Sequence, residues 1–259
     1  MPRFAANLSM MFGEIPFLDR FAAARKAGFE AVEFLFPYEH PAAEIAGRLK
    51  DNGLAQVLFN APPGDWTKGE RGMAALPGRQ GEFRDGIRLA LDYAAALECP
   101  RLHVMAGLIP EGVAHDTLTA TYGANLAWAA EECAKIGVKP VIEPINHRDI
   151  PGFFLNTTDQ AAAIIAAVGP EKLGMQFDLY HCQITEGDIV KRVEKHLPLI
   201  AHMQVADNPG RNEPGTGEVN WPFVFEAIDA LGFRGWVGCE YRPRGETLAG
   251  LGWFAPYRA

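Results

Sequence analysis

Eight short apolar runs alternate with segments of helical periodicity along the chain, and this alternation constrains the fold more than any other feature. Each run is six or seven residues long, which suits a buried strand. The expected strands are residues 4–9, 31–36, 54–60, 101–106, 138–143, 173–178, 199–205 and 236–241. The expected helices between them carry apolar residues at three- and four-residue spacing: 16–27, 41–52, 80–97, 116–136, 157–168, 187–196 and 221–231. This α/β alternation predicts a parallel sheet.

Chain length and turn residues favour a closed barrel over an open sheet. The 259 residues match the typical length of one (β/α)8 barrel. Glycine follows several expected helices, as in KAGFE and DNGL, where it can end a helix before the next strand. No G-x-G-x-x-G motif follows the first strand, which weakens the dinucleotide-binding alternative. We therefore predict one (β/α)8 TIM barrel domain over residues 1–259.

Charge and composition exclude several classes of partner. The chain has 24 Lys and Arg against 32 Asp and Glu, a formal net charge of −8, with no basic block. Such a chain is a poor candidate for binding nucleic acid or an anionic membrane. Four scattered cysteines without a C-x-x-C motif suit a reducing compartment. With no signal-peptide pattern and no apolar run approaching 18 residues, the expectation is a cytoplasmic protein that acts on a small molecule.

Four of the expected strands end on an oxygen-bearing side chain that can bind a metal: Glu143, Asp178, Gln204 and Glu240. In a parallel β/α barrel the carboxyl ends of the strands meet on one face, where catalysis takes place. Carboxylate and amide oxygens suit a hard divalent cation, Mg²⁺ or Mn²⁺. Any one acidic residue at a strand end is more often a helix cap or a surface charge. The four together favour a metal-assisted enzyme.

Two of these carboxylates are candidates for acid–base catalysis. Glu143 and Glu240 end the fifth and eighth expected strands, so they should face each other across the barrel mouth. One could remove a proton from carbon while the other delivers a proton to the neighbouring carbon. A metal would polarise the carbonyl and stabilise an enediolate. This arrangement suits a proton-transfer isomerase.

Several histidines could contact a substrate at the mouth. His181 follows Asp178 by three residues and could donate a hydrogen bond to a substrate oxygen, although a capping role is equally good. His202 alternates with Gln204 and should face the barrel interior. His103 and His147 could line the pocket. The remaining histidines are expected at the solvent surface: His40, His115 and His196.

Two expected βα loops are unusually long, residues 61–77 and 206–220, and loops of this length are commonly functional. Arg71 lies in the first and Arg211 in the second. Either arginine could clamp a substrate carboxylate in a bidentate way. A solvated loop arginine is the simpler interpretation of each.

The motifs together resemble a known family. VIEPIN, FDLYHCQ, GCEYRP and PPGDWTKGERGMAALPGR are similar to segments of hydroxypyruvate isomerases, which are xylose-isomerase-like TIM barrels. The most specific segment is HMQVADNPGRNEPGTGE. The resemblance implies interconversion of hydroxypyruvate and 2-hydroxy-3-oxopropanoate (tartronate semialdehyde), with Glu143 and Glu240 as the proton donor and acceptor. It also implies a divalent metal on Glu143, Asp178, Gln204 and Glu240.

Other functions remain open at this stage. A sister branch isomerises 2-oxo-tetronates, and ketose 3-epimerases share the layout but carry His where Gln204 stands. Two functions of other classes also fit this fold: a metal-dependent DNA-repair nuclease, whose sites are rich in His, and a non-catalytic barrel that binds a small ligand. A homo-oligomer is possible because Trp253, Phe254 and Tyr257 could pack on a neighbouring subunit. Packing on the chain's own barrel is at least as good an expectation.

Overall fold

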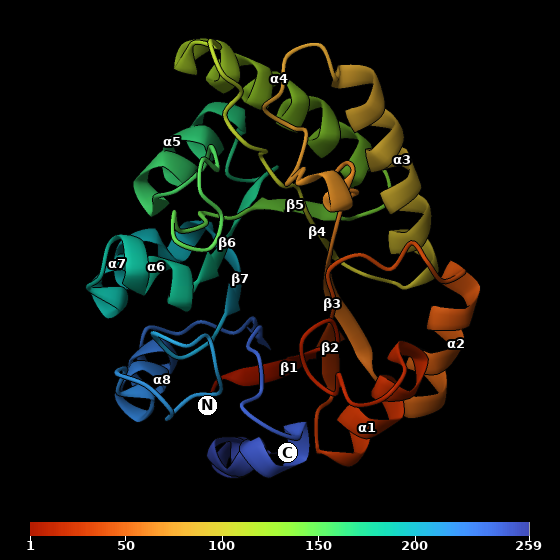
Figure 1. Cartoon of the computed structure of the whole chain (residues 1–259), viewed down its shortest axis with the longest axis vertical. Helices are drawn as coiled ribbons and strands as arrows, with labels where there is room; N and C mark the ends of the chain where they lie inside the picture. Colours follow the sequence, from red (N-terminus) through yellow and green to blue (C-terminus); the bar gives the residue numbers. More distant parts are fainter. Residues whose placement is uncertain (259) are drawn as a thin grey trace.

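The computed structural model describes residues 1–258, and within them the strands close into a parallel barrel in sequence order (Figure 1). The strands are β1 (Arg3–Asn7), β2 (Ala31–Glu33), β3 (Ala55–Asn60), β4 (Arg101–His103), β5 (Lys139–Ile142), β6 (Gly174–Asp178), β7 (Ile200–Gln204) and β8 (Trp236–Cys239). Closure is made by β1 and β8, which pair in parallel from Arg3 with Trp236 to Ala6 with Cys239. The predicted (β/α)8 barrel is confirmed.

Helices surround the barrel, mostly where the periodicity predicts them (Figure 1). They are α1 (Arg20–Lys26), α2 (Ala42–Asn52), α3 (Gln80–Ala96), α4 (His115–Ala134), α5 (Thr158–Val168), α6 (Leu179–Thr185), α7 (Ile189–His196) and α8 (Trp221–Ala230). Gly53 ends α2 in the left-handed conformation with φ of 59°, as the DNGL turn predicts. Thr157 caps α5 by accepting a hydrogen bond from the backbone N–H of Gln160.

The prediction missed α6 and the 3-10 helix Thr247–Tyr257. The first is a short helix that begins directly after β6, so no polar linker separates the two patterns. Several strands also end one to three residues before their apolar runs do. Beyond Glu33 and His103, for example, the backbone leaves the ladder to form the barrel mouth, where residues 104–106 are buried and Leu35 and Phe36 are half-buried.

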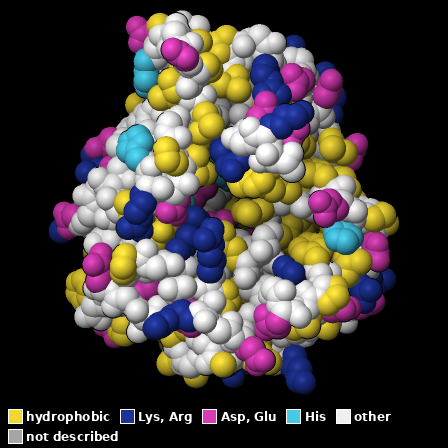
Figure 2. Space-filling view, in the orientation of Figure 1, with side chains coloured by type: hydrophobic (Ala, Val, Ile, Leu, Met, Phe, Trp, Pro, Cys, Tyr) yellow, Lys and Arg dark blue, Asp and Glu magenta, His cyan; other side chains and the backbone are white. Residues whose placement is uncertain are grey.

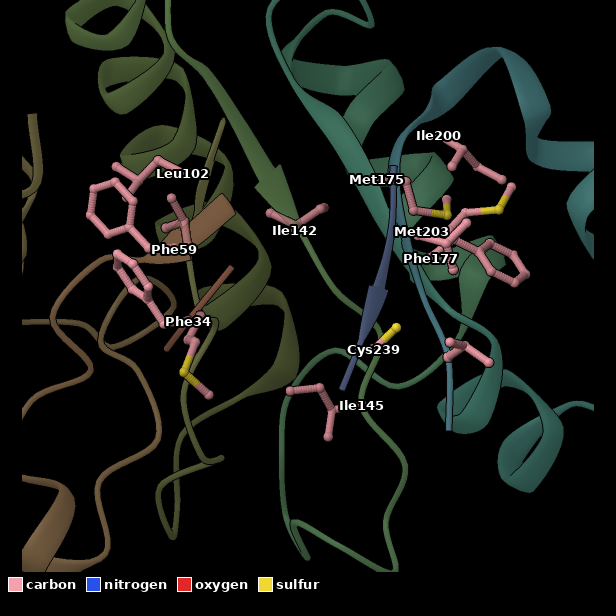
Figure 3. Close-up of a cluster of buried hydrophobic side chains, with 14 of the residues drawn as sticks. Phe34, Phe59, Leu102, Ile142, Ile145, Met175, Phe177, Ile200, Met203 and Cys239 are labelled. Atoms are coloured by element: carbon pink, nitrogen blue, oxygen red, sulfur yellow. The ribbon is translucent and has the colours of Figure 1, made fainter. Parts of the chain in front are cut away.

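Apolar side chains fill the layer between strands and helices, as Figure 3 shows for Phe59, Met175 and Met203. Successive side chains of a strand point to opposite faces. On β6 and β7 the alternate residues Gln176, His202 and Gln204 are therefore directed inward, and all three are buried. The barrel interior beneath the mouth is accordingly polar.

The C-terminal segment packs on the chain's own barrel. Phe4 of β1 makes edge contacts with the rings of Trp253 and Tyr257, and Phe29 stacks on Phe254 with ring centroids 4.3 Å apart. This confirms the simpler expectation for these aromatics. His196 is buried rather than exposed, with Nε2 3.1 Å from Oδ1 of Asp159, so the prediction for this residue is wrong.

Among residues 1–258, no helix has the length and apolar character needed to cross a membrane.

Candidate active site

A cavity of about 600 Å³ opens at the carboxyl ends of the strands. Figure 2 shows this hollowed face, with basic side chains on one side of the opening and hydrophobic ones on the other. The hydrophobic wall follows β1 to β4 and includes Met10, Leu35, Phe36, Trp66 and Met105. The basic wall follows β5, β7 and β8 and includes Arg148, Arg211 and Arg242. An anionic group of a ligand would therefore bind at the wall that carries Arg148, Arg211 and Arg242, or at Arg71 on the rim.

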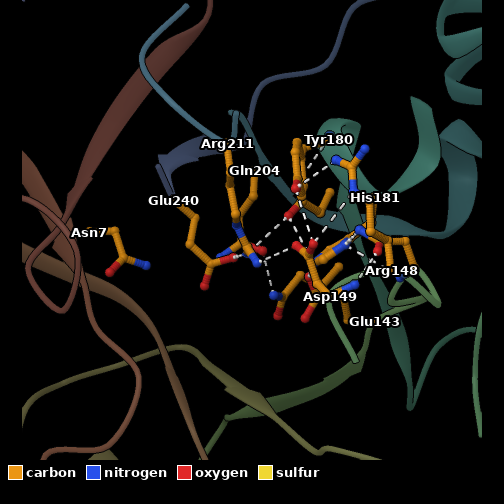
Figure 4. Close-up of polar contacts among 12 residues, drawn as sticks. Asn7, Glu143, Arg148, Asp149, Tyr180, His181, Gln204, Arg211 and Glu240 are labelled. Carbon is orange, nitrogen blue, oxygen red and sulfur yellow. Dashed lines mark hydrogen bonds and ion pairs between the residues drawn. The ribbon is translucent and has the colours of Figure 1, made fainter. Parts of the chain in front are cut away.

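Glu143 and Glu240, the two predicted acid–base residues, both line this cavity and are buried, each with 4% of its surface exposed. Each comes immediately after its strand, β5 or β8. Oε1 of Glu143 has no hydrogen-bond partner in the described part of the chain. Oε2 of Glu240 accepts a 2.6 Å hydrogen bond from Nη2 of Arg211 (Figure 4).

Glu143, Asp178, His181 and Glu240 each place one potential ligand atom within 4.8 Å of the others. Oδ2 of Asp178, like Oε1 of Glu143, is buried without a hydrogen-bond partner among residues 1–258. Buried carboxylate oxygens ordinarily have partners, so these two mark a place where a cation or a donor would fit. The three carboxylates of this set suit a hard divalent cation.

Burial dominates the acid–base properties of the three carboxyl groups. It raises the pKa of Asp178 to about 6 and that of Glu240 to about 8, and the guanidinium of Arg211 opposes both shifts. Burial, followed by the charges of Glu240 and Asp178, raises the pKa of Glu143 well above its ordinary value. A site with such carboxyl groups can hold a proton near neutral pH, which is what an acid–base pair requires.

His181 is held in one tautomer by Asn146. Its Nδ1 accepts from the backbone N–H of Asn146 at 3.3 Å and lies 2.5 Å from that residue's side-chain Nδ2. The Asn146 amide is itself oriented, because its Oδ1 accepts from the N–H of Asp149. The proton of the neutral ring is therefore on Nε2, which points at Oδ2 of Asp178 and Oε1 of Glu143, at 3.5 and 3.8 Å. Burial lowers the pKa of His181 well below its ordinary value, so the ring is a neutral donor.

His103 flanks Glu143 on the other side, with Nε2 3.6 Å from Oε2 of the carboxylate. The ring lines the cavity, is 1% exposed, and has no hydrogen bond from either nitrogen to the described residues. Burial lowers the pKa of His103 to about 3. His147, the other candidate on this face, is exposed and does not line the cavity.

Arg211 connects three βα loops at the mouth. Its Nη1 lies 3.1 Å from Oδ2 of Asp149, Nη2 bonds Glu240, and the guanidinium lies over the ring of Tyr180 at 5.0 Å (Figure 4). Nε has no hydrogen-bond partner within residues 1–258. Arg211 has a φ of 57°, an uncommon conformation for a non-glycine residue. One donor of the guanidinium, the Nε–H, is thus buried without an acceptor in the described residues.

The loop that carries Arg211 is closed by one carboxylate. Oδ2 of Asp207 accepts hydrogen bonds from the backbone N–H groups of Gly215, Thr216 and Gly217 at 2.8–3.0 Å. A Cβ at Gly217 would overlap the carbonyl oxygen of Asn208, so the PGTGE sequence is needed for this turn. The long 206–220 loop is therefore fixed rather than extended.

Arg71 lies at the cavity rim in a different environment. Its guanidinium stacks on Trp66 at 3.8 Å, and Nη1 bonds the carbonyl oxygens of Trp66 and Glu70 at 3.2 and 2.7 Å. It lines the cavity but is separated along the barrel from the arginines that follow β5, β7 and β8.

Gln204 lies below the carboxylates in the polar barrel interior. Its Oε1 accepts from Gln176 at 2.5 Å, and its Nε2 donates to Oε1 of Glu33 at 2.8 Å. Glu33 also accepts from Asn7 at 2.9 Å and lies 2.6 Å from Nε2 of His202. The hydrogen bond from Nε2 of Gln204 to Glu33 fixes the orientation of the Gln204 amide, so that its Oε1 is directed away from Glu33.

Sequence reasoning missed Glu33 as a member of the site. The available signal was that Glu33 is the only charged residue in the run AVEFLF. It was overlooked because its partners His202 and Gln204 are on β7, on the far side of the interior. A Cβ on Gly238 would overlap the Glu33 carboxylate, so the glycine in GWVGCE makes room for it.

Fold and site together define a parallel (β/α)8 barrel with a buried acidic centre at its mouth. Residues 21–257 match the family described as xylose isomerase-like TIM barrel. The chain belongs to this family, which confirms the resemblance inferred from the motifs.

The chain aligns over nearly its whole length with curated isomerases. The 2-oxo-tetronate isomerase of Cupriavidus necator is 58% identical over 257 residues, covering 99% of each chain. The hydroxypyruvate isomerase of Escherichia coli is 47% identical over 258 residues, covering 100% of each chain. We therefore place the chain among the isomerases of the family.

Solved structures agree on the fold. A Brucella melitensis structure titled AP endonuclease, family 2, has a TM-score of 0.98, 50% identity and coverage of 100% of both chains. The 3-keto-D-glucoside 4-epimerase of E. coli, at a TM-score of 0.80 and 20% identity over 99% of each chain, shares the fold alone.

Proposed function

We propose that this chain isomerises a small 2-oxo acid, moving the carbonyl group from C2 to C3 by proton transfer through an enediolate. The observation that carries the proposal is the placement of Glu143 and Glu240, buried and with raised pKa values, in one cavity with the neutral donor His181. Hydroxypyruvate and a 2-oxo-tetronate are both substrates of this kind, and both occur in the names of the curated relatives.

The two glutamates suit opposite roles in one proton transfer. The carboxylate that removes the C3 proton must be ionised, and the partner that supplies C2 must be protonated. Arg211 donates a hydrogen bond to Glu240, whereas it acts on Glu143 only through its charge. The guanidinium therefore favours the ionised form of Glu240 more than that of Glu143. We therefore assign Glu240 as the base and Glu143 as the acid in the direction from 2-oxo acid to product, with the roles exchanged in reverse.

His181 and Arg211 orient the substrate. With its proton on Nε2, His181 can donate to the substrate oxygen on which negative charge develops. The free Nε–H of Arg211 is available for the substrate carboxylate. Arg71 is the alternative clamp, with Nη1 bonded to two backbone carbonyls and its guanidinium stacked on Trp66 at the rim.

Glu143, Asp178 and Glu240 would hold a divalent cation, Mg²⁺ or Mn²⁺, which when bound would polarise the substrate oxygens as a Lewis acid. Gln204, the fourth predicted ligand, would join them only if its Oε1 turned away from Gln176. The two unpartnered carboxylate oxygens support this assignment. The nuclease alternative is disfavoured because the centre holds one histidine among three carboxylates, and the chain is acidic. Gln204 in place of the epimerase histidine disfavours a ketose 3-epimerase.

The test is NMR in D₂O with metal-supplemented protein and, in separate samples, hydroxypyruvate and a 2-oxo-tetronate. Conversion of at least one acid with deuterium in the product is the expected result. Conversion with complete retention of the substrate hydrogen would replace proton transfer by a hydride shift. If neither acid were converted, the proposed reaction would be wrong, and the non-catalytic barrel that binds a small ligand would be the better interpretation.

A further inference from the structure

His103 and Asn60 are two polar side chains on the cavity wall to which the proposed mechanism assigns no contact with the substrate. His103 ends β4 and Asn60 ends β3, and the two residues are register partners on adjacent strands. Neither ring nitrogen of His103 has a hydrogen-bond partner in the described residues. At Asn60 the backbone carbonyl accepts from the hydroxyl of Tyr38, which leaves the side-chain amide available to a ligand in the cavity. Both residues are buried and both line the cavity.

Their position in the barrel places them opposite the proposed carboxylate clamp. In a closed barrel of eight strands in sequence order, β3 faces β7 and β4 faces β8. Arg211 is in the loop after β7 and Glu240 comes directly after β8. A substrate whose carboxylate meets Arg211 therefore directs its other end toward His103 and Asn60.

The two candidate acids differ only at that other end. Both have the carboxylate at C1, the carbonyl at C2 and a hydroxyl at C3, which are the groups that react. The 2-oxo-tetronate carries in addition a C4 hydroxymethyl group, on the side of C3 remote from the carboxylate. Hydroxypyruvate has no atom there.

We propose that His103 and Asn60 form a subsite for the C4 hydroxyl of a four-carbon 2-oxo acid, so that the enzyme selects this acid over hydroxypyruvate. The inference rests on the proposed isomerase function. A hydroxyl donates one hydrogen bond and accepts two, which matches an imidazole acceptor or donor beside an amide. A three-carbon acid would leave the buried ring of His103 without a partner, and that cost is what makes hydrogen-bonding sites selective.

The competing role for His103 is support of Glu143, whose Oε2 is 3.6 Å from the imidazole Nε2. The two roles give different kinetic patterns. Loss of support for Glu143 lowers kcat on both substrates by the same factor. Loss of a C4 subsite lowers kcat/KM on the four-carbon acid alone. Asn60 separates them further, because no hydrogen bond or ion pair joins its side chain to Glu143 in residues 1–258.

The experiment compares kcat and KM of wild type, His103→Leu, His103→Gln and Asn60→Ala on both acids. We expect His103→Leu and Asn60→Ala each to lower kcat/KM for the 2-oxo-tetronate by about tenfold or more, the scale of a lost buried hydrogen bond. Values for hydroxypyruvate should stay within about threefold in Asn60→Ala, and in His103→Leu they should fall by less than those for the 2-oxo-tetronate. His103→Gln, which keeps a donor and an acceptor, should recover part of the four-carbon activity. His115→Gln, on the exposed start of α4, is the matched control.

A second measurement keeps this inference separate from the proposed reaction. Calorimetric titration with erythronate and with glycerate, which lack the 2-oxo group, tests binding without turnover. Tighter binding of the four-carbon acid, lost in His103→Leu and Asn60→Ala, supports the subsite even if neither 2-oxo acid is isomerised. Equal losses on both substrates, or equal binding of the two acids by wild type, would overturn it. Thermal unfolding checks that each variant is folded.

Discussion

The guanidinium of Arg211 donates a 2.6 Å hydrogen bond to the carboxylate of Glu240, although the two residues belong to different βα loops. Both are largely buried, with 14% and 6% of their side-chain surfaces exposed. The pair brings a fixed positive charge to the acidic centre, where Oδ2 of Asp178 is also 3.9 Å from Nη2. Arg211 is therefore the residue whose removal should disturb both the carboxylate pKa values and the binding of substrate.

Arg211→Gln should lower kcat/KM by about 10- to 100-fold, the range for losing a charge-assisted hydrogen bond. Since Arg211 lowers the pKa of Glu240, the variant should also need a higher pH to reach its maximum rate. The measurement is a pH series of steady-state rates, with Arg84→Gln on the exposed face of α3 as the control for a lost guanidinium. An unchanged pH profile would show that Arg211 does not set the ionisation of Glu240.

Glu143→Gln and Glu240→Gln should each lower kcat by roughly 10²–10⁴-fold, the usual contribution of a general acid or base. The amide keeps the size of the side chain but cannot transfer the proton. Rates of isomerisation and of deuterium uptake from D₂O should be measured together, with Glu131→Gln on the exposed surface of α4 as the control. Activity within tenfold of wild type in either variant would remove that residue from the proton transfer.

Asp178→Asn should weaken Mg²⁺ and Mn²⁺ binding by at least about tenfold, because a carboxylate at the centre is replaced by a neutral amide. The fold should be retained, since Oδ1 of Asp178 caps α6 through the N–H of Tyr180 and asparagine caps equally well. Calorimetric titration of chelator-treated protein measures the affinity, and Asp116→Asn at the start of α4 is the control. If both variants bound metal as wild type does, Asp178 would not be a ligand.

The sequence predicted those parts of the site that depend on strand order alone. Glu143, Asp178 and Glu240 end strands, and any closed parallel barrel brings such positions to one mouth. What the sequence did not reveal depends on side-chain contacts between distant strands, such as Glu33 with His202, or on local orientation, such as Asn146 with His181. Neither contact leaves a periodic signal. The α6 helix was missed for a related reason, since it follows β6 without a linker.

The stability of the metal-free protein should fall between pH 7 and 8.5, and Glu240 should account for part of the fall. Glu240 has its pKa raised from 4.5 to about 8, so in this window the folded chain binds a proton that the unfolded chain has already lost. Stability declines with pH wherever the folded state binds more protons, so the favourable contribution present below pH 4.5 is lost as pH rises through about 8. Below pH 7 the buried histidines His103 and His181, whose pKa values are lowered, act in the opposite direction.

Urea unfolding of chelator-treated wild type and Glu240→Gln at several pH values measures the contribution of Glu240, together with its effect on the neighbouring Glu143. Buried cysteines such as Cys133, with its pKa raised to about 12, contribute a similar decline to both proteins and cancel in the comparison. The variant should therefore lose less stability than wild type over the same window, because its amide does not titrate. Equal declines in the two proteins would mean that Glu240 is ionised in the folded metal-free chain at neutral pH, and that the charge of Arg211 outweighs burial at this carboxylate.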